Sequence, residues 1–429
     1  MTLDWLRLDR ELTTALRAWR RASSMLERDP SASDVCPIPE RLVHGERVSE
    51  VADSDDPLAR AFLPWLEALS SERGSWDDRV ALARHFQTRV PVPVRATSLS
   101  LRELRAEMWQ SEHAGERHAL GVTLAESSGT MSDAAVNALE RRLEREGRAI
   151  EVAGVDAALV EELAGRWLEA TRDLAAPWQR CGWVDGLRAA FGSDAHEGWP
   201  ARLRPRWIED VFANTRLAAG LSIELGALPE AWGAASFCRA LGMFGVSLLD
   251  ASRPAAMPLA LHQHPRGTRR HTRFALFAAL PAERSFAERV LTLGRGRGLD
   301  QSRRVAAALL CSLRVDALRV RLAASLSRGE NAFRETFAEV TETMFGEPLP
   351  SSLAGVLPRL RAADAPAFVG SIVAIEDRDA LVGAYDEDWF RNPHAAERLR
   401  QADQSMRDDE RDAERCLVSA VQRFETILG

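Results

Sequence analysis

Lysine is absent from this chain of 429 residues, so all 56 basic residues are arginine. A Schiff base and a lysine general base are therefore excluded. Tyrosine is also scarce, since it occurs only at Tyr385. Against 63 acidic residues the net charge is -7. This balance favours solubility and argues against non-specific binding of polyanions, so nucleic-acid binding would need a local basic patch and is not expected.

Paired cysteines and long hydrophobic runs are missing as well. The odd number of cysteines and the lack of a C-x-x-C pair are typical of a reducing compartment. The first 21 residues carry charges throughout and lack the apolar run of a signal peptide. No window approaches 18 uncharged apolar residues, so we expect a cytoplasmic protein without a membrane partner. The five cysteines lie far apart, at Cys36, Cys181, Cys238, Cys311 and Cys416.

Strand-like alternation is almost absent, whereas apolar residues recur at spacings of three and four along most of the chain. This periodicity is typical of amphipathic helices. Only residues 89–100 favour a short extended element, because their prolines cannot lie inside a helix. We therefore predict an all-α protein with an N-terminal helical lobe over residues 1–150 and a C-terminal helical lobe over residues 151–429.

The segment 230–249 is predicted to be a buried helix of the C-terminal lobe. Its large apolar residues cover one broad helical face, and Gly242 and Gly245 would allow another helix to approach closely. The side chains expected in the core are Trp232, Phe237, Leu241, Phe244 and Leu248.

Motifs of several enzyme classes are also absent. No H-E-x-x-H pair of zinc peptidases occurs, and the nearest pattern, His113 to His118, places its histidines five residues apart, too far around a helix to close on one ion. The glycine-rich run 293–304 lacks the lysine and the hydroxyl of a P-loop, so it indicates a helix-capping loop. Serine and cysteine lack the flanks of known nucleophiles.

The densest group of chemically capable side chains lies in residues 259–274, LALHQHPRGTRRHTRF. His262 and His264 form an H-x-H pair that could bind a metal from an extended segment, although the neighbouring arginines would oppose a divalent cation. An anion-binding or partner-binding loop and an ordinary basic surface are the other two interpretations. The arginines concerned are Arg266, Arg269, Arg270 and Arg273, and His271 lies among them.

Residues 199–327 resemble zinc metallopeptidases of the oligoendopeptidase F and thimet oligopeptidase type. The segments that carry the resemblance are ASFCRALGM at 235–243, MPLALHQHPRGTRRHTRFALF at 257–277 and RRVAAALLCSLRVDAL at 303–318. A fainter similarity covers DEDWFRNPHAAERLRQ at 386–401, which is similar to the ending of that family. The resemblance implies an all-α fold with a deep cleft between helical lobes.

Carried over residue by residue, the resemblance assigns the two zinc-binding histidines to Ala235 and Arg239, the catalytic glutamate to Ser236 and the downstream glutamate ligand to His271. The family also stabilises its oxyanion with tyrosines and a histidine, where this chain has Phe368 in ADAPAFVGSIV. Alanine cannot bind a metal, serine is a poor base near neutral pH, and arginine repels zinc. None of the four functional side chains is retained.

The leading hypothesis is therefore a catalytically inactive, metallopeptidase-like protein that binds a protein or peptide partner, without a metal or another cofactor. Its vestigial site would bring Ala235, Arg239 and His271 together, with Ser236 and His264 lining the cleft. Two alternatives stay open. One is a metallohydrolase with a relocated metal on His264, His271 and a carboxylate, and the other is a helical protein that binds anions or nucleic acid through its arginine-rich loops.

Overall fold

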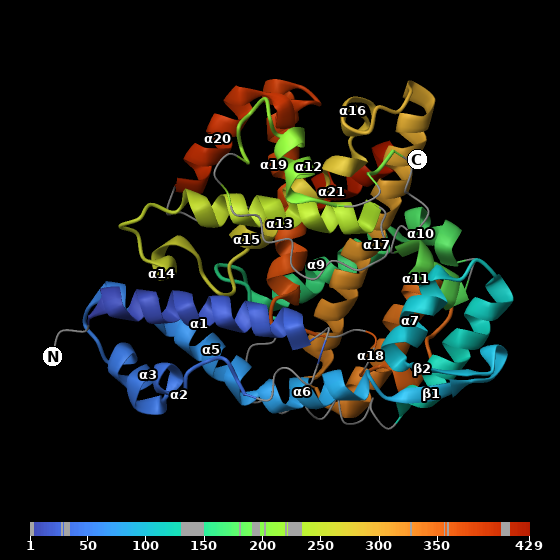
Figure 1. The fold of residues 1–429 in the computed structure, drawn as a ribbon, viewed down its shortest axis with the longest axis horizontal. Helices are drawn as coiled ribbons and strands as arrows, with labels where there is room; N and C mark the ends of the chain where they lie inside the picture. Colours follow the sequence, from blue (N-terminus) through green and yellow to red (C-terminus); the bar gives the residue numbers. More distant parts are fainter. Residues whose placement is uncertain are drawn as a thin grey trace.

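The computed structural model describes the chain except for short segments. The described residues are 4–26, 29, 35–129, 150–179, 182–190, 198–200, 203–218, 221, 234–326, 328–355, 357, 360–404 and 412–429. Helices hold 75% of the structure and strands 3% (Figure 1). The prediction of an all-α protein is confirmed.

The N-terminal unit, as we call the helices α1 to α6, has a core of its own. Leu8, Leu12, Phe62 and Leu66 are fully buried in it, and Leu259 from the second half of the chain joins the same cluster. Its helices are α1 (Trp5–Leu26), α2 (Glu40–Val43), α3 (Gly45–Ala52), α4 (Pro57–Ala61), α5 (Leu63–Gly74) and α6 (Trp76–His85).

A two-stranded antiparallel sheet follows, where the prolines predicted an extended element. Strand β1 (Arg89–Val92) pairs with β2 (Thr97–Ser100). Helix α7 (Leu101–Gln110) then begins with a capping box, because the Ser100 hydroxyl accepts from the Glu103 amide and the Glu103 carboxylate accepts from the Ser100 amide. A further helix covers residues 114–129. The sequence of residues 132–148 also predicts a helix, but this segment lies outside the described residues.

The remaining helices form the larger body of the molecule. They are α9 (Ala157–Ala170), α10 (Arg172–Gln179), α11 (Gly182–Ala190), α12 (Pro205–Val211), α13 (Ala234–Ser252), α14 (Leu259–His262), α15 (Arg269–Ala278), α16 (Arg284–Arg289), α17 (Arg295–Leu326), α18 (Glu330–Phe345), α19 (Asp364–Tyr385), α20 (Pro393–Gln404) and α21 (Ala413–Leu428). The glycine-rich run 293–304 was expected to be a helix-capping loop, but from Arg295 onward it forms the first turns of α17 itself.

The hydrophobic cores divide the chain near residue 80 rather than at residue 150. Phe86, Leu101 and Leu120 pack in one cluster with Trp167 of α9 and Phe424 of α21. The segment between β1 and residue 125 therefore belongs to the body, although the sequence placed it in the N-terminal lobe. Local periodicity predicts helices but carries no information about which helices share a core.

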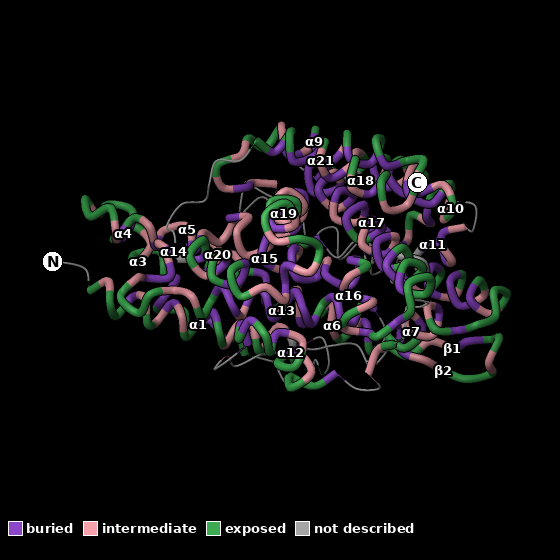
Figure 2. Tube along the Cα trace, turned by 90° about the horizontal axis from the view of Figure 1, so that it is seen from above, coloured by how far each residue is buried: buried purple, intermediate pink, exposed green. Residues whose placement is uncertain are grey.

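Three helices packed in succession lie at the centre of the body. Helix α15 packs against α13 on one side and α19 on the other. Figure 2 shows α19 end-on, surrounded by buried segments of the neighbouring helices. Helix α13 is the one helix in the described residues that is long and apolar enough to cross a membrane, and 67% of that window is buried inside the structure. It is the core helix that the sequence predicted.

The burial expected for α13 is confirmed for the residues that the structure describes. Phe237, Leu241 and Phe244 are fully buried and Leu248 is nearly so, whereas Trp232 lies outside the described residues. A Cβ atom added to Gly242 would come within 2.6 Å of the Phe274 ring, and one added to Gly245 within 2.6 Å of the Arg273 carbonyl oxygen. Both glycines are therefore needed for the close approach of α15.

Candidate functional site

Helices α13 and α15 run antiparallel, and this direction decides where the expected vestigial residues lie. Ala234 near the start of α13 packs with Ala278 at the end of α15. At the opposite end, Asp250 of α13 binds Arg270 of α15 through two contacts of 2.8 and 2.9 Å. The start of α15 is therefore level with the end of α13.

The expected pocket of Ala235, Arg239 and His271 is not formed. Ala235 and Arg239 are exposed, one turn apart on α13. His271 is level with the residues between Gly245 and Asp250, at least six residues or about 9 Å of helix rise beyond Arg239. Moreover, the His271 Cβ atom faces Gly370 of α19 rather than α13. The expectation was wrong because it fixed residue spacing within one helix but not the register between two helices.

The other residues expected to line the cleft, Ser236 and His264, are buried or hydrogen bonded within the fold. Ser236 is buried in α13. His264 lies in the turn before α15, where its Nδ1 atom accepts a hydrogen bond of 3.1 Å from the Arg266 backbone amide. Burial lowers the pKa of His271 to about 4, and the Arg270 and Arg361 guanidinium groups act in the same direction. The His264 Nδ1 atom is therefore already engaged with the main chain, and burial favours the neutral form of His271.

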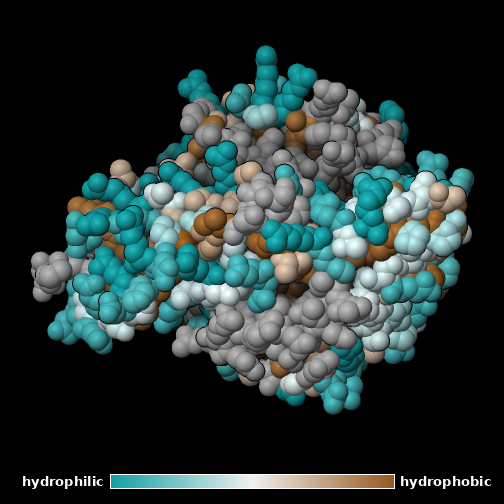
Figure 3. Space-filling model, turned by 60° about the horizontal axis from the view of Figure 1, so that its bottom comes forward, coloured by the Kyte–Doolittle hydropathy of each residue, from teal (hydrophilic) through white to brown (hydrophobic). Residues whose placement is uncertain are grey.

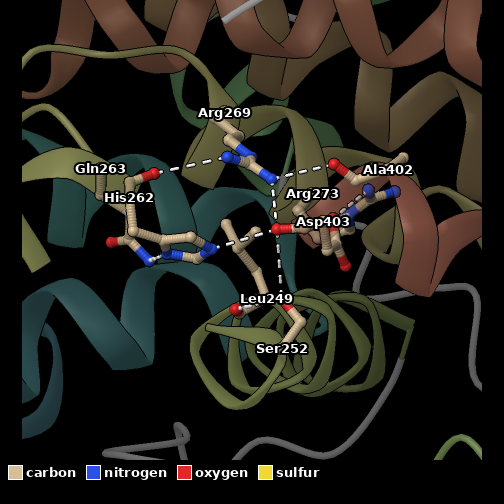
Figure 4. A network of polar contacts seen from close by, with 8 residues as sticks. All are labelled: Leu249, Ser252, His262, Gln263, Arg269, Arg273, Ala402 and Asp403. Atoms are coloured by element: carbon tan, nitrogen blue, oxygen red, sulfur yellow. Dashed lines mark hydrogen bonds and ion pairs between the residues drawn. The ribbon is translucent and has the colours of Figure 1, made fainter. Parts of the chain in front are cut away.

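Residues 262–263 and α15 instead meet the end of α20 in a polar network, which we call the α20 joint (Figure 4). It consists of His262, Gln263, Arg269, Arg273 and Asp403. The Arg273 guanidinium donates to the Asp403 carboxylate, with Nε at 3.1 Å from Oδ1. Both residues are buried, and the Asp403 side chain is fully inaccessible. Nothing in the local sequence of α20 distinguishes Asp403, which only the packing brings to Arg273.

The main chain at the end of α20 is also held by basic side chains. Arg269 donates to the Ala402 carbonyl oxygen at 3.0 Å and to the Asp403 carbonyl oxygen. His262 Nε2 lies 3.1 Å from the same Asp403 oxygen. Carbonyl groups in the last turn of a helix lack intrahelical donors, so cationic and polar donors stabilise them there.

Each of the four arginines expected to form an anion site has a carboxylate or carbonyl partner. Arg273 and Arg269 bind the end of α20, Arg270 binds Asp250, and the Arg266 Nε atom lies 3.7 Å from the Glu151 carboxylate. Together they hold three segments, at Asp250, at Glu151 and at the end of α20, instead of converging on one point. We therefore reject the interpretation of this loop as an anion site.

The α20 joint is connected to the N-terminal unit. The Trp65 indole donates to the Gln263 carbonyl oxygen at 2.8 Å, and the Leu259 amide donates to the Asp9 carboxylate at 2.7 Å. The Gln263 amide in turn donates to Asp250 at 2.8 Å. Segments from α1, α5, α13, α15 and α20 thus meet around residues 259–263.

A second buried arginine, Arg314 of α17, has partners of a different kind. Its Nη1 atom donates to the Leu168 carbonyl oxygen at 2.7 Å and to the Thr171 hydroxyl at 2.6 Å, and Nη2 donates to the Thr343 carbonyl oxygen at 3.1 Å. These acceptors lie at the ends of α9 and α18. No carboxylate of the described residues hydrogen bonds to this guanidinium. Burial lowers its pKa to about 10.

Comparisons of the chain with protein-family models, with curated proteins and with solved structures gave no match. Within the described ranges, no group of three or more histidine, cysteine, aspartate or glutamate side chains could hold a metal ion. Among the described residues on the face shown in Figure 3, hydrophobic side chains lie in small separate patches.

Proposed function

We propose that this protein acts by binding a protein or peptide partner, as a non-catalytic relative of the oligopeptidase type whose partner lies in a groove between helical lobes. The observation that carries the proposal is the exposed face of α13. Ala235 and Arg239, which replace the two zinc-binding histidines in the resemblance, both face solvent on this helix. Met243 and Ser247 continue the same line at four-residue spacing and are half-buried.

This face has the chemistry of a peptide contact rather than of a hydrolytic centre. An exposed guanidinium can bind a carboxylate in a bidentate manner, and the methionine beside it is an adaptable apolar surface. The histidines and arginines that could have served a reaction are engaged in holding helices together. We therefore expect recognition of an acidic, extended peptide segment without cleavage.

The proposal is tested with a fluorescently labelled acidic peptide. Wild-type protein is expected to bind it, and Arg239→Glu is expected to weaken binding at least about tenfold, because a favourable charge pair becomes a repulsive one. The matched control is Arg10→Glu on the exposed side of α1, which makes the same change in net charge. Equal weakening by both variants would show that only net charge matters and would refute a site on α13.

Metal analysis and a peptidase assay test the non-catalytic part of the proposal separately. We expect no stoichiometric zinc after purification and no cleavage of the labelled peptide when zinc is added, since the residues at the four functional positions cannot complete a zinc site. Tightly bound zinc together with peptide cleavage would refute this part and favour a relocated metal site.

A further inference from the structure

We propose that His262 is an acid-sensitive latch, which fastens the N-terminal unit to the end of α20 only while its imidazole ring is neutral. The ring is buried between the two parts. On one side it contacts the Asp403 carbonyl oxygen of α20. On the other side it contacts the Gln263 side chain. The Gln263 carbonyl oxygen accepts a hydrogen bond from the Trp65 indole of the N-terminal unit.

The hydrogen bonds fix the protonation state of the ring. A carbonyl oxygen only accepts, so His262 Nε2 carries the hydrogen that is donated to Asp403 at 3.1 Å. The Gln263 Nε2 atom lies 3.4 Å from His262 Nδ1, and the same amide nitrogen donates to Asp250 Oδ1 at 2.8 Å. A carboxylate also only accepts, so the amide must present its nitrogen here. His262 Nδ1 must therefore accept, which requires a neutral ring.

Protonation would place two donors against each other. A proton on His262 Nδ1 would face the Gln263 amide nitrogen, and the amide cannot turn over without directing its oxygen at the Asp250 carboxylate. The contact must then open. Because the Gln263 carbonyl oxygen holds Trp65, a shift of this segment also disturbs the attachment of α5.

The charged groups around the ring come from every element packed against it. Arg253 after α13 and Arg269 of α15 oppose a positive charge on His262, whereas Asp250 of α13 favours it. The Asp403 carboxylate of α20 also favours it but is bound to Arg273 of α15. From the N-terminal unit, the Asp9 carboxylate of α1 is engaged with the Leu259 amide and Arg253, and Arg60 of α4 with the Asp55 carbonyl oxygen.

Burial of His262 also favours the neutral form of its ring. It lowers the pKa of His262 below its usual value of 6.5, and the two arginines add to this effect. The closed latch therefore binds fewer protons than the open one between pH 6.5 and the lowered pKa. By linkage, the closed form is fully favoured above pH 6.5 and loses stability as the pH falls through this window.

The latch is tested by hydrogen exchange of the full chain between about pH 8 and about pH 5, after correction for the intrinsic pH dependence of exchange. In the wild type, exchange in α14, the last turn of α20 and the α5 segment around Trp65 is expected to accelerate below pH 6.5, by up to about tenfold per pH unit. Helix α17 serves as the internal reference. No acceleration in these three segments relative to α17 would overturn the proposal, and so would slower exchange.

Variants assign the effect to His262. His262→Gln, which can donate to Asp403 but does not titrate, is expected to lose the acid response. His394→Gln, an exposed histidine on the same helix as Asp403, is expected to keep it. His85→Gln is the second control, because burial lowers the pKa of this α6 histidine as well. Retention of the response in His262→Gln, or its loss in either control, would refute the assignment.

Trp65→Phe keeps the test informative if His262→Gln does not fold. It removes the indole donor but not the histidine. Exchange of α5 at neutral pH should then rise, and acidification should accelerate α14 and the end of α20 without further effect on α5. An unchanged acid response in α5 would show that Trp65 is not coupled to the latch.

Discussion

Two buried arginines of the body, Arg273 and Arg314, have their positive charge compensated in different ways. Arg273 is paired with a buried carboxylate, whereas Arg314 donates to acceptors at the ends of two helices. A helix C-terminus carries partial negative charge, so two such ends replace a counter-ion for Arg314. In the first case stability depends on one partner, and in the second it is distributed over three acceptors.

The largest effect on stability is expected at Asp403, because removing this one side chain removes the carboxylate partner of Arg273. Asp403→Ala leaves the Arg273 guanidinium buried without its carboxylate, so the free energy of unfolding should fall by about 3–5 kcal/mol. Urea denaturation measures this loss. The double variant Arg273→Met with Asp403→Leu removes both charges and should lose less than Asp403→Ala. A larger loss in the double variant would contradict the assignment of the effect to an unpaired charge.

A somewhat smaller effect is expected at Arg314. Arg314→Met removes the donor from the Leu168 and Thr343 carbonyl oxygens and the Thr171 hydroxyl, at a cost of about 3 kcal/mol in unfolding free energy. Arg314→Lys should recover only part of it, because an ammonium group cannot span acceptors on two helices. Full recovery by lysine, measured by the same urea titration, would show that charge rather than the guanidinium geometry matters.

His271 next to the α20 joint provides an acid-dependent effect of about 3 kcal/mol. Its pKa is lowered to about 4, so the folded state binds fewer protons than the unfolded state between pH 6.5 and 4. Stability should therefore fall as the pH drops through this window and level off below it. His271→Leu should reduce the fall, whereas His394→Gln on the surface should not. A fall of equal size in His271→Leu would place its origin elsewhere.

The smallest effects test how closely α15 approaches α19. In Gly370→Ala, the new Cβ atom would meet the His271 Cβ atom at 2.7 Å and the Thr272 backbone nitrogen at 2.9 Å, so a loss of about 1–2 kcal/mol is expected. Gly383→Ala on the same helix has nothing within 4 Å and should gain about 0.5 kcal/mol. Thermal unfolding compares the two, and equal shifts would contradict close packing at Gly370.

The sequence by itself determined the helical class, the short extended element and the buried face of α13. Each depends on local rules: apolar spacing for the helices and for the buried face of α13, and prolines for the extended element at Arg89–Val92. The glycines at 242 and 245 also predicted close packing, because a missing side chain is visible without coordinates.

Only the tertiary structure decided what the histidines and arginines of residues 259–274 do. Their density suggested a binding site, but their partners Asp403, Asp250 and Trp65 lie up to about 200 residues away and carry no local signal. The antiparallel register of α13 and α15 separates Arg239 from His271. The His271 Cβ atom instead faces Gly370 of α19. The sequence gives the chemical type of each side chain. Which partner that side chain contacts depends on which distant helices pack together in the common core.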